Sequence, residues 1–78
     1  MNSVDEALRR ARTGARIREL RLARDIKAVD LAAQVGCSDG HIHNIESGRS
    51  RATDETRLAI AAALGVPLAE IDLEEVAS

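Results

Sequence analysis

Two short helices joined by a tight glycine turn are predicted near the middle of this 78-residue chain. Leu31 and Val35 are four residues apart and therefore share one helical face. Gly36 follows them as a residue that can end a helix with a positive φ. Ser38 then stands at a position suited to an N-cap, so a second helix is expected to begin at about Asp39.

The second helix is predicted to be only about two turns long. Its apolar residues, Ile42 and Ile45, are three apart, and Gly48 closes it as a second C-terminal stop. Few helices of that length are stable alone in water, so its stability must come from packing against the rest of the chain. Two short helices joined in this way form a helix-turn-helix pattern, which points to DNA.

The composition excludes several other classes of protein. The chain has no Phe, Tyr or Trp, so it cannot stack aromatic rings on bases, and duplex DNA is expected rather than single strands or RNA. Its one cysteine, Cys37, is expected to be a small core residue and has no disulfide partner in the chain. No secretion signal, membrane-spanning run or lipidation motif is recognised, so a cytoplasmic protein with no membrane partner is expected.

Catalysis, a cofactor and a metal are not expected. The sequence has no nucleophile with a plausible base and no glycine-rich phosphate loop, and a single small domain leaves no core of pocket size. Cys37, His41 and His43 are close in sequence. The two histidines nevertheless lie about 200° apart around a helix, so they cannot chelate one ion.

Charge is unevenly distributed along the chain. The formal net charge is −2, but residues 1–27 carry eight cationic and four acidic side chains. Residues 52–78 carry one arginine and six acids. An acidic end can point away from DNA while a basic segment meets the phosphates, so the negative total weakens a DNA-binding hypothesis only modestly.

The amino-terminal segment is predicted to be helical from about Val4, because Ser3 and Glu6 form a capping box. Gly14 lowers helix stability by about 1 kcal/mol relative to alanine, and Thr13 offers a second N-cap, so one long helix or two are both possible. One stripe of this segment consists of small and apolar residues: Val4, Leu8, Ala11, Ala15 and Leu22.

This stripe faces nearly the opposite way from Ile17 and Leu20, so one straight helix cannot bury both sets in one core. There are three alternatives. The chain changes direction at Gly14, or the stripe stays outside the core to meet a partner such as a second copy of the chain, or the first dozen residues fray. We therefore treat residues 1–12 as an amino-terminal extension, 13–72 as the main domain and 73–78 as an acidic tail.

The carboxyl-terminal part is also predicted to be helical, which makes the fold all-α. Residues 47–52 form a polar loop, and Thr53 then caps a helix that runs through Leu64 and stops at Gly65. Pro67 begins a last short helix that contains Leu68 and Ile71.

Many spaced positions together resemble the Cro and phage-repressor (Xre-type, lambda-repressor-like) helix-turn-helix family over residues 14–72. They are Arg16-Ile17-Arg18-Glu19-Leu20-Arg21, Leu31-Ala32, Gly36-Cys37-Ser38, Ile42, Ile45-Glu46-Ser47-Gly48-Arg49 and the segment from Ile60 to Ile71. The resemblance implies a bundle of about five helices whose third helix lies in the major groove. It also implies homodimers that read two half-sites about one helical turn apart.

Four positions depart from that family's usual pattern. Lys27 and Ala28 stand where the second helix normally opens with Ser or Thr followed by Gln, so an N-cap and a phosphate contact are both missing. Ala52 replaces a common proline in the loop. Asp39 begins the recognition helix, where Arg or Gln is frequent, and this is the departure with most bearing on function.

With Ile42 and Ile45 toward the core, the candidate base-reading residues are Asp39, Gly40, His43, Asn44 and Ser47. Asn44 can pair with adenine, His43 can donate to guanine, and Asp39 can accept from cytosine N4 or can simply complement the helix dipole. Gly40 either lets the backbone approach the groove closely or is a neutral surface position.

The candidate phosphate-binding residues are Arg16, Lys27, Ser38, His41, Arg49 and Arg51. The resemblance also implies that Arg21 and Glu46 form the ion pair that ties the first helix to the recognition helix. A guanidinium fork on a carboxylate fixes orientation through two parallel hydrogen bonds.

The resulting prediction is a sequence-specific transcriptional regulator of prokaryotic or phage type. Its partner is a double-stranded DNA operator with a palindromic sequence, which it binds as a homodimer and most simply as a Cro-like repressor. No second domain is recognised, so a small-molecule effector is not expected. The alternative is an antitoxin or a protein-interaction adaptor built on the same fold.

Overall fold

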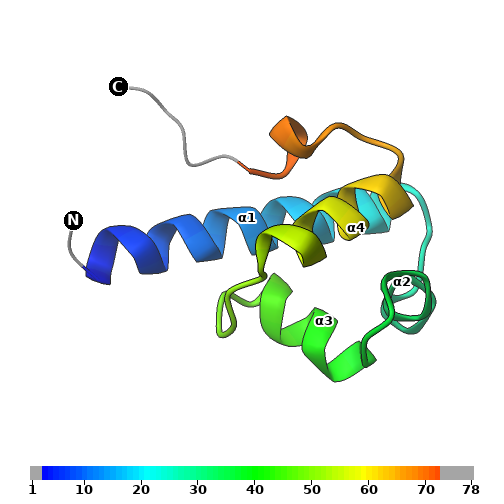
Figure 1. Cartoon of the computed structure of the whole chain (residues 1–78), viewed down its shortest axis with the longest axis horizontal. Helices are drawn as coiled ribbons and strands as arrows, with labels where there is room; N and C mark the ends of the chain where they lie inside the picture. Colours follow the sequence, from blue (N-terminus) through cyan, green and yellow to red (C-terminus); the bar gives the residue numbers. More distant parts are fainter. Residues whose placement is uncertain (1–2, 73–78) are drawn as a thin grey trace.

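Four α-helices and one short 3-10 helix make up residues 3–72, the part of the chain that this computed structural model describes (Figure 1). Helix α1 spans Ser3–Ala23, α2 spans Ala28–Val35, α3 spans Asp39–Glu46 and α4 spans Asp54–Leu64. The 3-10 helix η1 spans Leu68–Glu70. The all-α prediction is confirmed, with four α-helices in place of about five.

The last predicted helix is only a 3-10 turn. Pro67 is its N-cap, and the amides of Glu70 and Ile71 donate to carbonyls three residues back, those of Pro67 (2.9 Å) and Leu68 (3.0 Å). Short runs with this bonding pattern are common as connectors. Ile71 follows the turn and is fully buried.

The predicted ends of the two central helices are confirmed. Gly36 ends α2 in the left-handed region with φ of 90°, and its amide donates to the carbonyl of Ala32. Ser38 is the N-cap of α3, and its hydroxyl accepts from the amide of His41 at 3.1 Å. Lys27 precedes α2 without a side-chain cap, as its departure from the family pattern predicts.

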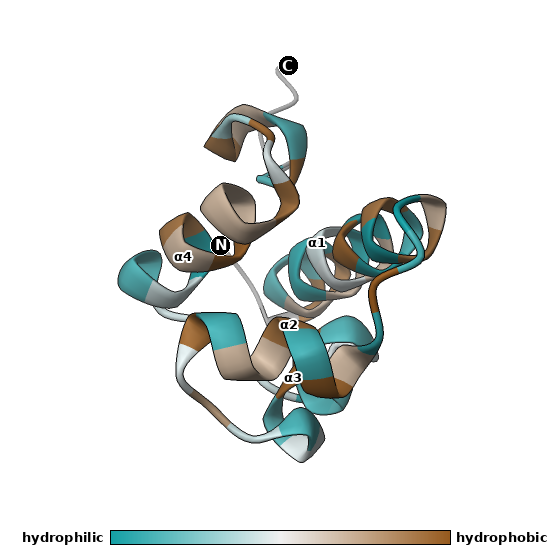
Figure 2. Cartoon of the chain, turned by 90° about the vertical axis from the view of Figure 1, so that its right-hand side faces the viewer, coloured by the Kyte–Doolittle hydropathy of each residue, from teal (hydrophilic) through white to brown (hydrophobic). Residues whose placement is uncertain are grey.

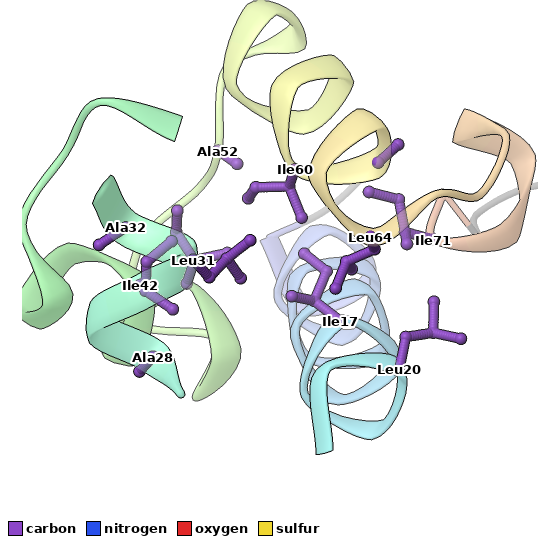
Figure 3. Close-up of a cluster of buried hydrophobic side chains, with 12 residues drawn as sticks. Ile17, Leu20, Ala28, Leu31, Ala32, Ile42, Ala52, Ile60, Leu64 and Ile71 are labelled. Atoms are coloured by element: carbon purple, nitrogen blue, oxygen red, sulfur yellow. The ribbon is translucent and has the colours of Figure 1, made fainter. Parts of the chain in front are cut away.

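The core is built from aliphatic side chains of all four α-helices and of the residue that follows η1. Ile17 of α1, Leu31 of α2, Ile42 of α3, Ile60 of α4 and Ile71 after η1 are all fully buried and converge in the interior (Figure 3). Burying one such side chain stabilises the fold by about 1.5 to 3 kcal/mol. The short helices α2 and α3 therefore owe their stability to this shared core.

Helix α1 is continuous through Gly14, so the chain does not change direction there. Ile17 faces the core, while Val4, Leu8 and Leu22 are 65%, 50% and 48% exposed. Figure 2 shows α1 nearly end-on, with α4 on one side and α2 and α3 on another, so that its remaining side is open. Of the three alternatives for the stripe, the structure supports the one in which it stays outside the bundle.

The predicted capping box involves the Ser3 side chain, which lies outside the described residues. The Glu6 carboxylate accepts from Nη1 of Arg51 at 3.3 Å and lies 3.9 Å from Nη1 of Arg10. Arg10 also donates through Nε to the carbonyl of Gly48 at 3.3 Å. The amino half of α1 is therefore tied to the loop that follows α3.

Candidate nucleic-acid interface

One face of α3 is buried and the other carries the candidate base-reading residues. Ile42 and Ile45 are 0% and 2% exposed. The outward side carries four exposed residues, Asp39, Gly40, His43 and Ser47, and the half-buried Asn44. All five predicted base readers are thus brought together on one surface.

Asn44 combines a fixed backbone with an unengaged side chain. Its carbonyl accepts from the amides of Arg49 and Ser50 at 2.9 and 3.1 Å and from the Ser47 hydroxyl at 3.2 Å. Within the described residues its carboxamide has no hydrogen-bond partner. The end of α3 is therefore held in place while the group that could read adenine remains available.

Helix α3 is locked to α1 by the pair Arg21 and Glu46. Nε and Nη2 of Arg21 donate to the two carboxylate oxygens at 2.7 and 3.0 Å, and Nη1 donates to the carbonyl of Ile26 at 2.9 Å. Both side chains are almost fully buried. The hydrogen bonds to Glu46 raise the pKa of Arg21 above its ordinary value, against the opposing effect of burial. The geometry is the bidentate fork that fixes orientation.

Gly14 brings the backbones of the same two helices into direct contact. A Cβ built on Gly14 would lie 2.6 Å from the carbonyl oxygen of Glu46 and closer still to that of Ile45. The sequence indicates only the helix-weakening effect of this glycine. Its contact partners are more than 30 residues away, so no local pattern reveals that the position must lack a side chain.

Arg49 lies beside the reading surface. With Arg18, His43, Glu46 and Ser47 it lines a shallow hollow between α1 and the end of α3. Arg18 is exposed and is absent from the sequence-based candidates, because only the packing of α1 on α3 brings it here. The two arginines supply positive charge at this edge of α3.

The side chain of Arg16 is held by η1 and does not lie beside α3. It donates to the carbonyl of Glu70 at 3.0 Å, to the Glu70 carboxylate at 2.6 Å and to Glu19 at 3.1 Å. These hydrogen bonds raise the pKa of Arg16. Arg16 also lies about 160° around α1 from Gly14, the residue that touches α3. Its place is therefore at the junction with η1, away from the reading surface.

The other phosphate candidates differ in how available they are. Arg51 is 67% exposed but pairs with Glu6, and Lys27 is exposed at the start of α2. Ser38 uses its hydroxyl oxygen as the cap of α3, which leaves its O–H free to donate to a phosphate. His41, in the first turn of α3, is half-buried.

Across residues 3–72, no group of three His, Cys, Asp or Glu side chains is arranged to hold a metal ion. No helix in the same range is long and apolar enough to cross a membrane.

Comparisons with known proteins agree with this geometry. A family model described as a helix-turn-helix domain matches residues 12–73. The clp gene regulator ClgR from Corynebacterium glutamicum superposes with a TM-score of 0.80 at 28% identity, covering 83% of this chain and 69% of that chain. The restriction-modification controller protein C.AhdI from Aeromonas hydrophila gives a TM-score of 0.76 at 28% identity, covering 78% of this chain and 92% of that chain.

No curated protein sequence matches. The family match nevertheless covers most of the chain and includes all of α2, α3 and α4. The chain therefore belongs to the helix-turn-helix DNA-binding family of the Cro and phage-repressor type.

Proposed function

We propose that this protein is a sequence-specific, double-stranded DNA-binding transcriptional regulator that acts as a repressor by occupying an operator. The observation that carries the proposal is the outward face of α3, on which Asn44 and His43 project while the helix is clamped from behind by the Arg21–Glu46 pair. The two structural neighbours, one named as a gene regulator and the other as a restriction-modification controller protein, support the same class of function.

The reading chemistry follows from the side chains on that face. Asn44 has the donor and acceptor needed for a bidentate contact with adenine N6 and N7, and His43 can donate to guanine. Asp39 can accept from cytosine N4. Gly40 has no neighbour closer than 3.9 Å to a built Cβ, so it leaves room for the groove wall.

The proposal includes a homodimer on a palindromic operator in the bacterial cytoplasm, with no small-molecule effector. The resemblance supports the dimer, since helix-turn-helix dimers of this kind place two recognition helices in successive major grooves. Phosphate binding is assigned to Arg49, Lys27, Ser38, His41 and Arg51, and Arg18 is added to them.

Selection of bound sites from random duplexes tests the proposal directly. We expect enrichment of a palindromic motif, and we expect the affinity for it to fall steeply with salt. If the selection enriches no motif, the regulator proposal is wrong and a protein-interaction adaptor on the same fold becomes the better hypothesis.

Replacing Asn44 by alanine should weaken binding to the selected site by about 1 to 3 kcal/mol, or about 5- to 150-fold, and relax the preference at one base pair. Competition between the selected site and variants at each position measures this. Gln34→Ala, which removes an exposed carboxamide from α2, is the matched control and should leave the preference intact. An unchanged specificity profile in the Asn44 variant would exclude it as a base reader.

Replacing Arg49 by alanine should weaken binding to all duplexes alike and reduce the slope of log affinity against log salt by about one phosphate equivalent. Arg16→Ala is the control, because the Arg16 guanidinium is engaged by Glu70 on the other side of α1. Salt titrations of the two variants should therefore diverge. Equal slopes would place Arg49 outside the interface.

A further inference from the structure

The outer face of α1 carries an uncovered apolar seam, which we define as Val4, Leu8, Ala11 and Ala15. The spacing between neighbours is four, three and four residues, the pattern of a coiled-coil a/d seam. Val4 and Leu8 are the most exposed large members, at 65% and 50%. All four residues are exposed, although the backbone of Gly48, in the loop after α3, lies against Ala11 on one side of the seam.

Most of the seam lies on a part of α1 that the family model does not include. The match begins at residue 12, whereas α1 begins at Ser3. In Figure 1 the first turns of α1, coloured blue, project beyond α3 and α4. Packing within the bundle therefore does not explain why this extension is apolar on its outer side.

Charges of opposite sign flank the seam along one edge. Asp5 and Arg12 are seven residues apart and occupy equivalent positions beside it. Both are exposed, and Arg12 forms no ion pair within residues 3–72. In an antiparallel helix pair, equivalent flanking positions of the two helices face each other across the seam.

We propose that the seam binds the same seam of a second copy in an antiparallel pair. Leu8 packs on Ala11 of the second copy, and Val4 packs on Ala15 of the second copy. By symmetry each contact occurs twice. Asp5 then faces Arg12 of the second copy on both sides of the pair, so the apolar and the charged contacts are satisfied in the same register.

Other registers conflict with the charges. Shifting the antiparallel pair by one heptad toward the carboxyl end would place Arg12 opposite Arg12 of the second copy. It would also place Leu8 against Arg18 of the second copy. The opposite shift would leave only Val4 on Leu8, with the two Asp5 side chains facing each other. A parallel pair would bring Arg18 against Arg18 at a seam position. Like charges placed in this way repel, so the proposed register is the favoured one.

The orientation suits a dimer that binds one duplex, and in this respect the inference rests on the proposed function. Gly14, which contacts α3, lies about 90° around α1 from the centre of the seam. The two-fold axis of an antiparallel pair runs perpendicular to the plane that contains the two helices. Each α3 therefore lies off this plane, along the direction of the two-fold axis. Both copies of α3 therefore lie on one side of the pair.

The contact is small. It involves one face of one helix from each copy, so the surface area that it buries is less than the roughly 1,200 Å² that stable interfaces bury. Dimerisation of the free protein is therefore expected to be weak. On a palindromic duplex the two bound copies are held close together, which raises their effective concentration, so the contact should be visible as cooperativity.

Charge reversal tests the register. Asp5→Arg and Arg12→Asp each replace two attractive contacts by two repulsive ones, so each should weaken self-association by about tenfold. The double variant, and an equimolar mixture of the two single variants, restore complementary pairs and should recover most of the loss. Glu55→Arg reverses an acid in the first turn of α4, away from the seam, and is the matched control.

Sedimentation equilibrium without DNA measures the association, and binding to a single half-site measures the reading function. Single variants that associate as tightly as the unaltered protein would overturn the inference, as would a double variant no better than either single one. Leu8→Lys should abolish association while preserving half-site binding. If the unaltered chain fails to bind any half-site, the proposed function fails, while the association measurement still decides the pairing of α1.

Discussion

A Gly14→Ala variant is expected to lose about 3 kcal/mol of its free energy of unfolding, at the upper end of what overpacking costs. The added methyl group would overlap the carbonyl oxygens of Ile45 and Glu46, which belong to backbone and cannot rotate away. The fold can accept it only by moving α1 away from α3. A domain of this size is stable by roughly 4 to 12 kcal/mol, so the loss is a large fraction of the total.

Urea denaturation followed by circular dichroism measures this loss. Gly40→Ala provides the matched control, because Gly40 is also a helical glycine but faces open space. Alanine there should stabilise the protein by up to about 1 kcal/mol, since it favours the helix and meets no obstacle. If both variants were equally stable, the close contact between α1 and α3 would be disproved.

Replacing Glu46 by alanine is expected to destabilise the protein by about 3 to 5 kcal/mol, because it leaves the Arg21 guanidinium buried without its carboxylate. Arg21→Met combined with Glu46→Leu should recover most of this loss, since a buried ion pair contributes little net stability relative to apolar side chains of similar size. Chemical denaturation of the single and double variants gives both values.

The double variant also separates folding from function. It should fold but bind the operator more weakly than the unaltered protein, because no bidentate fork then fixes the angle of α3. Unaltered operator affinity in a folded double variant would show that packing alone orients the reading helix. A single variant as stable as the unaltered protein would show that Arg21 regains water as its partner.

The elements of the fold that could be predicted from the sequence are those set by neighbouring residues. Gly36 and Ser38 define the turn between α2 and α3 through their own backbone preferences and local hydrogen bonds. The buried face of α3 follows from the spacing of Ile42 and Ile45 alone. The position of the candidate base-reading residues on the opposite face is a consequence of the same periodicity.

The features that could not be predicted depend on contacts between distant segments. The sequence makes Arg16 a phosphate candidate, but its partner Glu70 lies 54 residues away and is brought near only when η1 folds onto α1. Arg18 reaches the edge of the reading surface for a similar reason. The continuity of α1 through Gly14 depends on α3, which provides the packing that offsets the poor helix propensity of glycine.

The distribution of the core side chains has a thermodynamic consequence. Each of the four α-helices contributes one fully buried aliphatic side chain to a single cluster, as does Ile71 just after η1, so no helix can detach without opening a cavity among the others. The other buried side chains of α2 and α3, among them Ala32 and Ile45, belong to the same cluster, so neither helix has a separate core to stabilise it in a partly folded state. The domain should therefore unfold as one cooperative unit. A mutation anywhere in the core then reduces the population of the intact reading helix as effectively as one in α3 itself.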